Sequence, residues 1–177
     1  DWSSDVCSSD LDEVGRVLAE TRPRAVAYLV NAAVHDDRAV DAACRDLSSL
    51  IQRAAEHGVE RVVLSSSGAV YGDAARTPRS ESDALDGATL YARMKQRLEA
   101  ETARASEMSG VAWTALRIFN VYGPGCAASL VNRLTDGSRP TLLVTPGFVR
   151  DYVHVDDVAD AFVRAFAVTG GGVYNVG

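Results

Sequence analysis

The sequence predicts an α/β fold, a doubly wound parallel sheet with helices on both faces. Apolar runs of strand length recur along the chain, and stretches with helical periodicity separate them. Strands that are separated by helices pair in parallel, because each helix carries the chain back to the same end of the sheet. Short polar segments follow the apolar runs, as they do at the ligand-binding edge of open parallel sheets.

Three units of a helix followed by a strand are expected in the first part of the chain. The helices cover residues 14–18, 47–54 and 90–108, and the strands cover residues 25–30, 61–64 and 111–118. Pro23 ends the first helix, and Gly58 and Gly110 end the other two. Apolar runs without alternation, such as residues 25–30, are typical of strands buried on both faces.

The pattern is less regular after Tyr122. A turn is expected at residues 123–125, a short helix at 130–134, small strands near Leu142 and Tyr152, and a final strand at 173–176. Asp156 and Asp157 are expected to cap a last helix, which carries an apolar stripe.

The composition is that of one globular domain. The 177 residues are 47% apolar and 24% charged, and a net charge of -6 with a pI near 5.0 excludes a nucleic-acid surface. The longest apolar run, residues 25–34, contains Asn31 and is far shorter than the roughly 20 residues that cross a bilayer. Cys7, Cys44 and Cys126 lack the spacing of a disulfide framework or a metal site, so a reducing cytoplasm fits best.

Three segments are expected to meet at one edge of the sheet. They are residues 31–33, 65–67 and 119–120, with the sequences Asn-Ala-Ala, Ser-Ser-Ser and Phe-Asn. Parallel strands place their carboxyl ends along the same edge, and open sheets bind ligands there. The chemistry of the protein is therefore expected at this edge.

Tyr91 and Lys95 stand one turn apart on a predicted helix, so their side chains share a face. A phenol has a pKa of about 10, and making it a base at neutral pH takes about three units, or roughly 4 kcal/mol. A unit charge about 4 Å away supplies roughly 4 kcal/mol at an effective dielectric of about 20. The pair can therefore act as base and activating cation, although this spacing also arises by chance on helix surfaces.

The use of lysine in this chain argues against a chance pairing of Tyr91 and Lys95. Lys95 is the only lysine of the chain, beside 17 arginines. A compact ammonium can bridge a ribose hydroxyl and a phenolate, which a planar guanidinium cannot. Ser67 lies after the strand expected at residues 61–64, and its hydroxyl would hold a reacting substrate oxygen near the phenol. A polar strand end without chemistry is the alternative for this serine.

Five blocks of sequence follow one another in a recognisable order. They are LSSSGAVYG at residues 64–72, YxxxK at 91–95, LRIFNVYGPG at 116–125, RDYVHVDDVA at 150–159 and VYNVG at 173–177. With these blocks, residues 11–177 resemble the NAD-dependent epimerase/dehydratase branch of the extended short-chain dehydrogenases. The resemblance implies a Rossmann-like sheet and a nucleotide-sugar epimerase, with NAD as cofactor and NADP as the alternative.

The resemblance also implies roles for single residues. Tyr91 would be the general acid/base, Lys95 would make this phenol more acidic and hold the nicotinamide ribose, and Ser67 would bind the sugar hydroxyl that is oxidised. The positions that would line the cofactor are Ala32, Ala33, Ser65, Tyr91, Lys95 and Phe119. The positions that would hold the nucleotide diphosphate are Asn120 and Arg150, and a guanidinium fork suits phosphate oxygens. Relatives often form homodimers through the helix with Tyr91 and the one before it.

The same resemblance divides the chain into four parts. These are a non-native or disordered head (1–10), the C-terminal part of an NAD(P)-binding Rossmann domain (11–122), the start of a substrate-binding region (123–149) and a truncated return to the Rossmann sheet (150–177). The glycine-rich turn that receives the pyrophosphate in the family is not in this sequence, so we expect a fragment with weak cofactor affinity. Ala43 stands where relatives often carry Asn, so the sugar specificity is expected to differ.

The sequence leaves several activities open. An epimerase and a keto-sugar reductase would use the same three catalytic residues. Dehydration is disfavoured, because Gly68 and Ala69 stand where dehydratases usually have an Asp-Glu pair. A hydrolase triad with Ser67 and His154 has little support, since no G-x-S-x-G elbow surrounds the serine. An inactive fragment is the alternative for the chain by itself.

Overall fold

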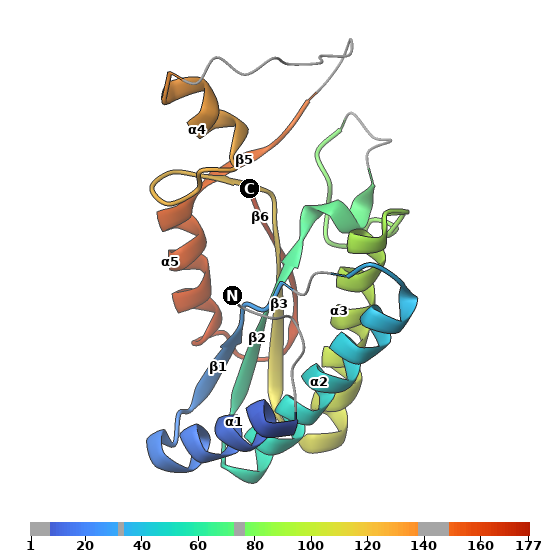
Figure 1. Ribbon diagram of the computed structural model, residues 1–177, viewed down its shortest axis with the longest axis vertical. Coiled ribbons are helices and arrows are strands. Elements are labelled where there is room, and N and C mark those ends of the chain that lie inside the picture. Colours follow the sequence, from blue (N-terminus) through green and yellow to red (C-terminus); the bar gives the residue numbers. More distant parts are fainter. Residues whose placement is uncertain (1–7, 32–33, 73–76, 138–148) are drawn as a thin grey trace.

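The computed structural model of the chain describes residues 8–31, 34–72, 77–137 and 149–177 (Figure 1). The elements are α1 (Ser8–Thr21), β1 (Ala25–Tyr28), α2 (Asp37–Glu56), β2 (Arg61–Ser67), the 3₁₀ helix η1 (Gly68–Tyr71), α3 (Leu90–Ser109), β3 (Ala112–Ile118), β4 (Asn120–Tyr122), α4 (Leu130–Thr135), β5 (Tyr152–His154), α5 (Val155–Ala165) and β6 (Gly172–Val176). None of the helices in these ranges has the length and apolar character of a membrane span.

A parallel sheet forms the centre of the molecule. Its strand order is β1-β2-β3-β6, and each neighbouring pair is parallel. The register of β2 with β3 runs from Arg61 opposite Ala112 to Ser67 opposite Ile118. All four strands therefore end on the same side, where η1, β4 and β5 also lie (Figure 1). This confirms the predicted α/β fold with a parallel sheet.

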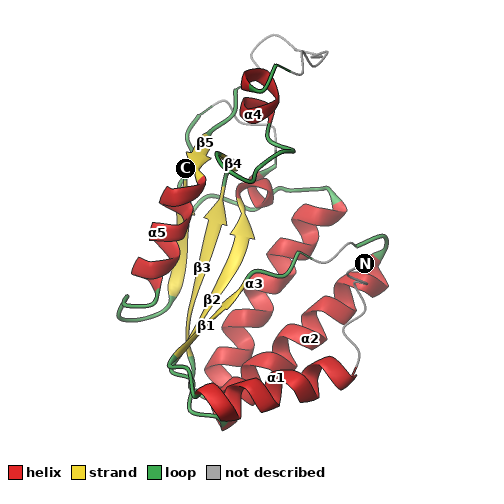
Figure 2. Cartoon of the chain, turned by 60° about the vertical axis from the view of Figure 1, so that its left-hand side comes forward, coloured by secondary structure: helices red, strands yellow, loops and turns green. Residues whose placement is uncertain are grey.

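Helices cover both faces of the sheet. The helices α2 and α3 pack together on one face with α1 beside α2, and α5 lies on the other face (Figure 2). Side chains of β2 alternate between the two layers: Val62 and Leu64 join the core beneath α2 and α3, while Val63 packs with Phe162 of α5. The central strand is thus buried on both faces, as its continuous apolar sequence predicts.

Local capping fixes the two ends of α3. The Thr89 side chain accepts a hydrogen bond of 3.1 Å from the backbone N–H of Ala92, which satisfies a donor of the first turn. At the other end Gly110 adopts a left-handed conformation with φ of 73°, which glycine reaches without the steric cost of a Cβ atom. The start of α3 sets the position of Tyr91, its second residue.

A smaller substructure stands above the carboxyl ends of the strands. The strands β4 and β5 form a second parallel pair, and Asn132 of α4 binds both backbone groups of Gly123, accepting from its N–H at 3.0 Å and donating to its carbonyl at 2.7 Å. Gly123 has φ of 118°, and a Cβ atom there would lie 2.7 Å from Nε2 of His154. The glycine turn after β4 is therefore packed tightly against β5.

Two strands differ in length from the sequence prediction. β1 ends at Tyr28, two residues before the predicted end at 30, and Leu29 and Val30 are largely exposed. β2 continues beyond Leu64, because Ser65–Ser67 pair with residues 116–118 of β3. The serine triplet is therefore the last part of the strand and does not follow it.

Three features of the helices and loops also differ from the prediction. α1 runs from Ser8 to Thr21 and is therefore longer than the helix expected at residues 14–18. The cap of α5 is His154, whose Nδ1 accepts from the backbone N–H of Asp156 at 3.2 Å. Asp156 and Asp157 lie in the first turn, where the helix dipole favours negative charge, so their prediction as caps is wrong. The strand expected near Leu142 lies outside the described residues.

Candidate active site

Lys95 is anchored between α3 and the end of β2. Its side chain is buried, with 2% of the residue exposed, and Nζ donates a hydrogen bond of 2.9 Å to the backbone carbonyl of Ser65. Burial lowers the pKa of this amine to about 8, because a charged group loses hydration inside the protein. Ser65, expected to line the cofactor, thus holds the chain's only lysine in place.

Tyr91 lies one turn before Lys95 on the same face of α3. The Lys95 Nζ atom lies 5.7 Å from the centroid of the Tyr91 ring, while Tyr91 itself is 37% exposed. Within the described residues, the hydroxyl of Tyr91 has no hydrogen-bond partner in the protein. The structure therefore brings the phenol and the ammonium together as predicted, with the phenol open to solvent.

Ser67 is the last residue of β2 and borders a cleft. Its side-chain oxygen accepts a hydrogen bond of 3.2 Å from the backbone N–H of Ala69 and so caps the short helix η1. The cleft has a volume of about 660 Å³, and its wall includes the predicted site residues Ser67, Phe119, Asn120 and Arg150. Tyr91 and Lys95 do not line this cleft. Lys95 is linked to it through its hydrogen bond to Ser65, two residues before Ser67.

The aromatic wall of the cleft rests on a glycine. The Phe119 ring stacks on Tyr71 with centroids 6.4 Å apart. A Cβ atom at Gly68 would lie 2.9 Å from the Phe119 ring, so a larger residue there would require the ring to shift from the strand end. Nothing in the sequence pattern singles out Gly68 for this packing.

The two residues expected to hold a diphosphate lie at the rim of the cleft. The side-chain amide of Asn120 donates to the backbone carbonyl of Asp151 at 2.8 Å, which leaves its Oδ1 and its second N–H for a ligand. Arg150 is exposed and donates to the backbone carbonyl of Val149 at 3.1 Å. Ala32 and Ala33, expected to line the cofactor, lie outside the described residues.

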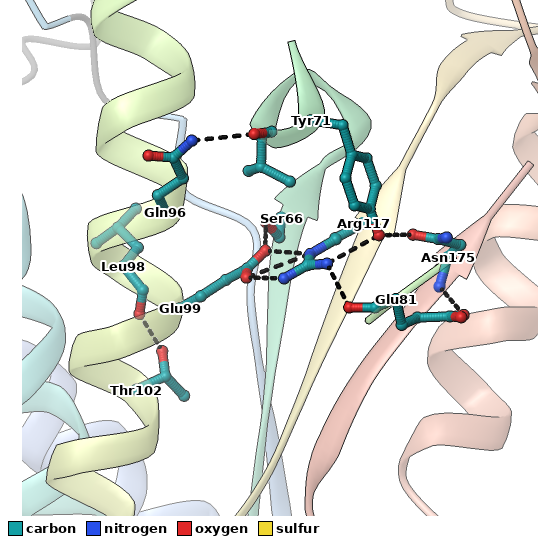
Figure 3. Close-up of polar contacts among 10 residues, drawn as sticks. Ser66, Tyr71, Glu81, Gln96, Leu98, Glu99, Thr102, Arg117 and Asn175 are labelled. Atoms are coloured by element: carbon teal, nitrogen blue, oxygen red, sulfur yellow. Dashed lines mark hydrogen bonds and ion pairs between the residues drawn. The ribbon is translucent and has the colours of Figure 1, made fainter. Parts of the chain in front are cut away.

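A buried polar network lies beneath the end of β2 (Figure 3). Glu99 of α3 and Arg117 of β3 form an ion pair of 2.7 Å, and each has less than a tenth of its side chain exposed. The Ser66 hydroxyl donates to the same carboxylate. Arg117 also donates to the Tyr71 hydroxyl at 2.8 Å, and that hydroxyl donates to Asn175 at 2.7 Å. The network thus connects α3, three strands and the wall of the cleft.

Burial by itself lowers the pKa of Arg117, but its hydrogen bonds with Glu99 and Tyr71 and the nearby carboxylate charge outweigh this and raise the pKa above its usual value. The guanidinium therefore stays charged. Sequence analysis missed this network. Two signals were present: an Arg inside the mostly apolar strand 111–118, and a Glu one turn after Lys95 on the same helix face.

The hydrogen bonds of the structure do not form a hydrolase triad. Within the described residues, Ser67 binds only the backbone of Ala69, and His154 uses Nδ1 to cap α5. The His154 ring packs edge-on against Tyr122, with centroids 5.2 Å apart. This histidine therefore has a structural role in the junction of β5 and α5.

The fold and the site define a class of protein: an extended short-chain dehydrogenase/reductase, with a tyrosine and a lysine one turn apart on a helix that is anchored to the serine-rich end of a parallel strand. The chain belongs to the NAD dependent epimerase/dehydratase family, whose sequence pattern it matches over residues 4–177.

Relatives and solved structures of similar fold support the same assignment. UDP-glucose 4-epimerase of Mycolicibacterium smegmatis is 33% identical over 191 aligned positions, which cover 98% of this chain and 60% of the relative. UDP-glucose 4-epimerase of Thermotoga maritima, solved with UDP-glucose, has a TM-score of 0.81 at 26% identity, with 95% of this chain and 60% of that chain covered. The Thermus thermophilus UDP-glucose 4-epimerase complex with NAD has a TM-score of 0.78 at 29% identity and the same coverage.

The chain is shorter than these relatives. It spans about 60% of the length of the Mycolicibacterium smegmatis and Thermotoga maritima enzymes. Residues 4–177, which match the family, include the Tyr91 and Lys95 pair, the end of β2 and the cleft.

Proposed function

We propose that the protein containing this chain is an NAD-dependent nucleotide-sugar epimerase with Tyr91 as its general acid/base. One observation carries the proposal. The chain's only lysine is hydrogen-bonded to the carbonyl of Ser65, two residues before Ser67, and its ammonium lies 5.7 Å from the centroid of the Tyr91 ring. This is the arrangement that a phenolate base needs beside a bound sugar hydroxyl.

The three residues have separate tasks in the proposed reaction. Ser67 donates a hydrogen bond to the sugar oxygen and so orients the sugar hydroxyl, and the phenolate of Tyr91 takes the proton of that hydroxyl. The ammonium of Lys95 stabilises the phenolate electrostatically, in a site where burial strengthens the interaction. When bound, NAD would supply reversible hydride chemistry at the carbon that bears this hydroxyl, which would allow the carbon to be inverted. Tyr91 then gives the proton back to the sugar oxygen.

The residues present fit a nicotinamide ribose near Lys95. An ammonium has three N–H donors, and one of them is bound to Ser65. The other two can serve a ribose hydroxyl and the phenolate. Phe119 follows β3 at the same edge of the sheet and would lie beside the cofactor. Ala32 and Ala33 remain predicted cofactor contacts.

The cleft suits a nucleotide-sugar substrate. Its volume of about 660 Å³ lies within the roughly 300–1,000 Å³ of small-molecule sites. We propose that Arg150 and Asn120 bind the diphosphate at its rim, because a guanidinium and an amide N–H donate to phosphate oxygens. Solved relatives have been captured with UDP-glucose, in the Thermotoga maritima enzyme and in MoeE5, and the MoeE5 structure also contains NAD.

The test is interconversion of UDP-glucose and UDP-galactose by the intact protein that contains this chain. Tyr91→Phe removes the acid/base and is expected to lower kcat by about 10²-fold or more. Tyr174→Phe is the matched control, because Tyr174 is an exposed tyrosine of β6 that lies outside the proposed site, and it should leave kcat unchanged. Equal activity of Tyr91→Phe and Tyr174→Phe would refute the role of Tyr91.

The same assay separates an epimerase from a keto-sugar reductase. An epimerase interconverts the two sugars with no net change in reduced cofactor, since the hydride returns to the sugar. Stoichiometric consumption of the reduced nicotinamide with a keto-sugar substrate would favour the reductase.

A further inference from the structure

We propose that Glu99 is a positioning residue, which acts through Ser66 and Arg117 to hold the end of β2 in register with α3. This inference rests on the proposed function, because its purpose is to fix Ser67 relative to Tyr91. Neither Glu99 nor Ser66 needs to touch the substrate for this role.

The contacts of α3 with β2 follow each other in matched steps. Tyr91, Lys95 and Glu99 are spaced by one helical turn each on α3. Lys95 binds the carbonyl of Ser65. Glu99 accepts a hydrogen bond from the hydroxyl of Ser66 (Figure 3). Two successive turns of the helix thus hold two successive residues of the strand. The next residue of the strand is Ser67.

Arg117 connects a third element, β3, to Glu99 and Ser66. In the sheet, Ser66 lies directly opposite Arg117 of β3. The Arg117 guanidinium donates to both carboxylate oxygens of Glu99, at 3.0 Å from Nε and 2.7 Å from Nη2. One carboxylate therefore fixes the helix, the strand with Ser67 and the neighbouring strand relative to one another.

The network continues from Arg117 to the cleft wall. Tyr71, which lines the cleft, receives a hydrogen bond from Arg117 and donates one to Asn175. Asn175 also donates to the backbone carbonyl of Arg79 at 2.9 Å, and its backbone N–H donates to Glu81 at 2.8 Å. The same charge pair thus sets both the serine end of β2 and one wall of the cleft.

A purely structural role predicts a different outcome. Replacing a buried ion pair with apolar residues is often neutral for stability, so stability alone gives little reason for this network. If the pair only stabilised the fold, variants that still fold would keep the kcat of the wild type. If it positions Ser67, folded variants lose kcat, because small displacements of a reacting group slow proton transfer strongly.

The main variant is Ser66→Ala in the intact protein. It removes the bond to Glu99 but leaves the charge pair with Arg117 intact, so the fold should survive. We expect kcat to fall about tenfold, with KM changed less than about twofold and Tm lowered by only a few degrees. Ser66→Cys keeps a weak donor of similar size and should restore part of kcat.

A matched control lies on the same helix. Thr102 is fully buried, and its hydroxyl donates only within α3, to the carbonyl of Leu98 at 2.7 Å (Figure 3). Thr102→Val should leave kcat unchanged. A loss of kcat in Ser66→Ala no larger than in Thr102→Val would overturn the proposal.

The double variant Glu99→Met/Arg117→Met separates the loss of positioning from the effect of an unpaired buried charge. It removes both buried charges together, so no ion is left unpaired and the chain should fold. We expect kcat to fall about tenfold or more in this variant as well. Wild-type kcat in the folded double variant would overturn the proposal.

Amide hydrogen exchange gives a readout that does not depend on turnover. In Ser66→Ala, the amides of residues 65–68 should exchange faster than in wild type, while those of residues 112–116 should not change. Unchanged exchange at residues 65–68 would overturn the positioning role. If the wild type fails to interconvert nucleotide sugars, the proposed function fails, and this exchange measurement still decides whether Glu99 and Ser66 hold the strand end.

Discussion

At the scale of single residues, Lys95 is placed where it weakens the fold. Its ammonium is buried and has one protein hydrogen bond in the described part of the chain, to the carbonyl of Ser65. Burial of a charge with few partners costs free energy, which appears as the lowered pKa of this amine. A group kept at the expense of stability is typical of an active site.

Lys95→Met is therefore expected to stabilise the chain while it abolishes activity. The shift of the pKa from 10.5 to about 8 corresponds to roughly 3 kcal/mol, and the lost bond to Ser65 offsets part of it, so we expect a net gain of about 1–2 kcal/mol at pH 7. Between pH 8 and 10.5 the unfolded chain binds the proton more tightly than the folded chain, so the wild type gains stability as the pH rises through this window.

Urea unfolding at pH 7 and pH 10 measures this difference. The advantage of Lys95→Met should shrink at the higher pH, because the wild-type amine has lost its charge there. The exposed Arg97→Met serves as a control, since Arg97 pairs with Asp41 on the surface of the helix layer. A variant at Lys95 that is less stable than wild type at pH 7 would contradict the cost assigned to burial.

At the scale of secondary structure, α3 is the element on which the site depends. Its first turn carries Tyr91, and the Thr89 cap holds that turn together. We expect Thr89→Ala to lower the free energy of unfolding by about 1 kcal/mol and to reduce kcat a few-fold, because fraying of the first turn moves the phenol.

Gly110→Ala is the matched control at the opposite end of α3. A Cβ atom at Gly110 would contact nothing within 4 Å, so the cost comes only from its φ of 73° and should again be about 1 kcal/mol. This variant leaves the turn with Tyr91 intact and should keep kcat. Chemical unfolding and steady-state kinetics compare the two variants, and an equal effect on kcat would show that only global stability matters.

The helices, the strands and the pairing of Tyr91 with Lys95 could be predicted from the sequence, while the contacts between distant segments could not. The spacing of Tyr91 and Lys95 defines their contact within one helix. The ion pair of Glu99 and Arg117 joins a helix to a strand, so it depends on how the two elements are aligned in the fold. The strand character of Ser65–Ser67 also depends on pairing with β3, because serine has no strong preference for strands.

At the scale of the whole molecule, the two proposed ligands have different support. The cleft that we propose for a nucleotide sugar lies within the described residues, whereas the glycine-rich turn that would receive the pyrophosphate of NAD is not in residues 1–177. We therefore expect residues 1–177 alone to bind UDP more tightly than NAD, with a Kd for NAD of about 1 mM or weaker. Calorimetry with each ligand checks this, and tight NAD binding would contradict it.

The single lysine also allows the protonation of its amine to be observed directly. Because Lys95 is the only residue of its type, lysine labelled with stable isotopes would place one side-chain signal in a magnetic resonance spectrum of the chain. That signal reports from inside the site, so a titration would follow the gain and loss of its proton without assignment. The same experiment with a nucleotide sugar added would show how the ligand changes the charge state of the amine.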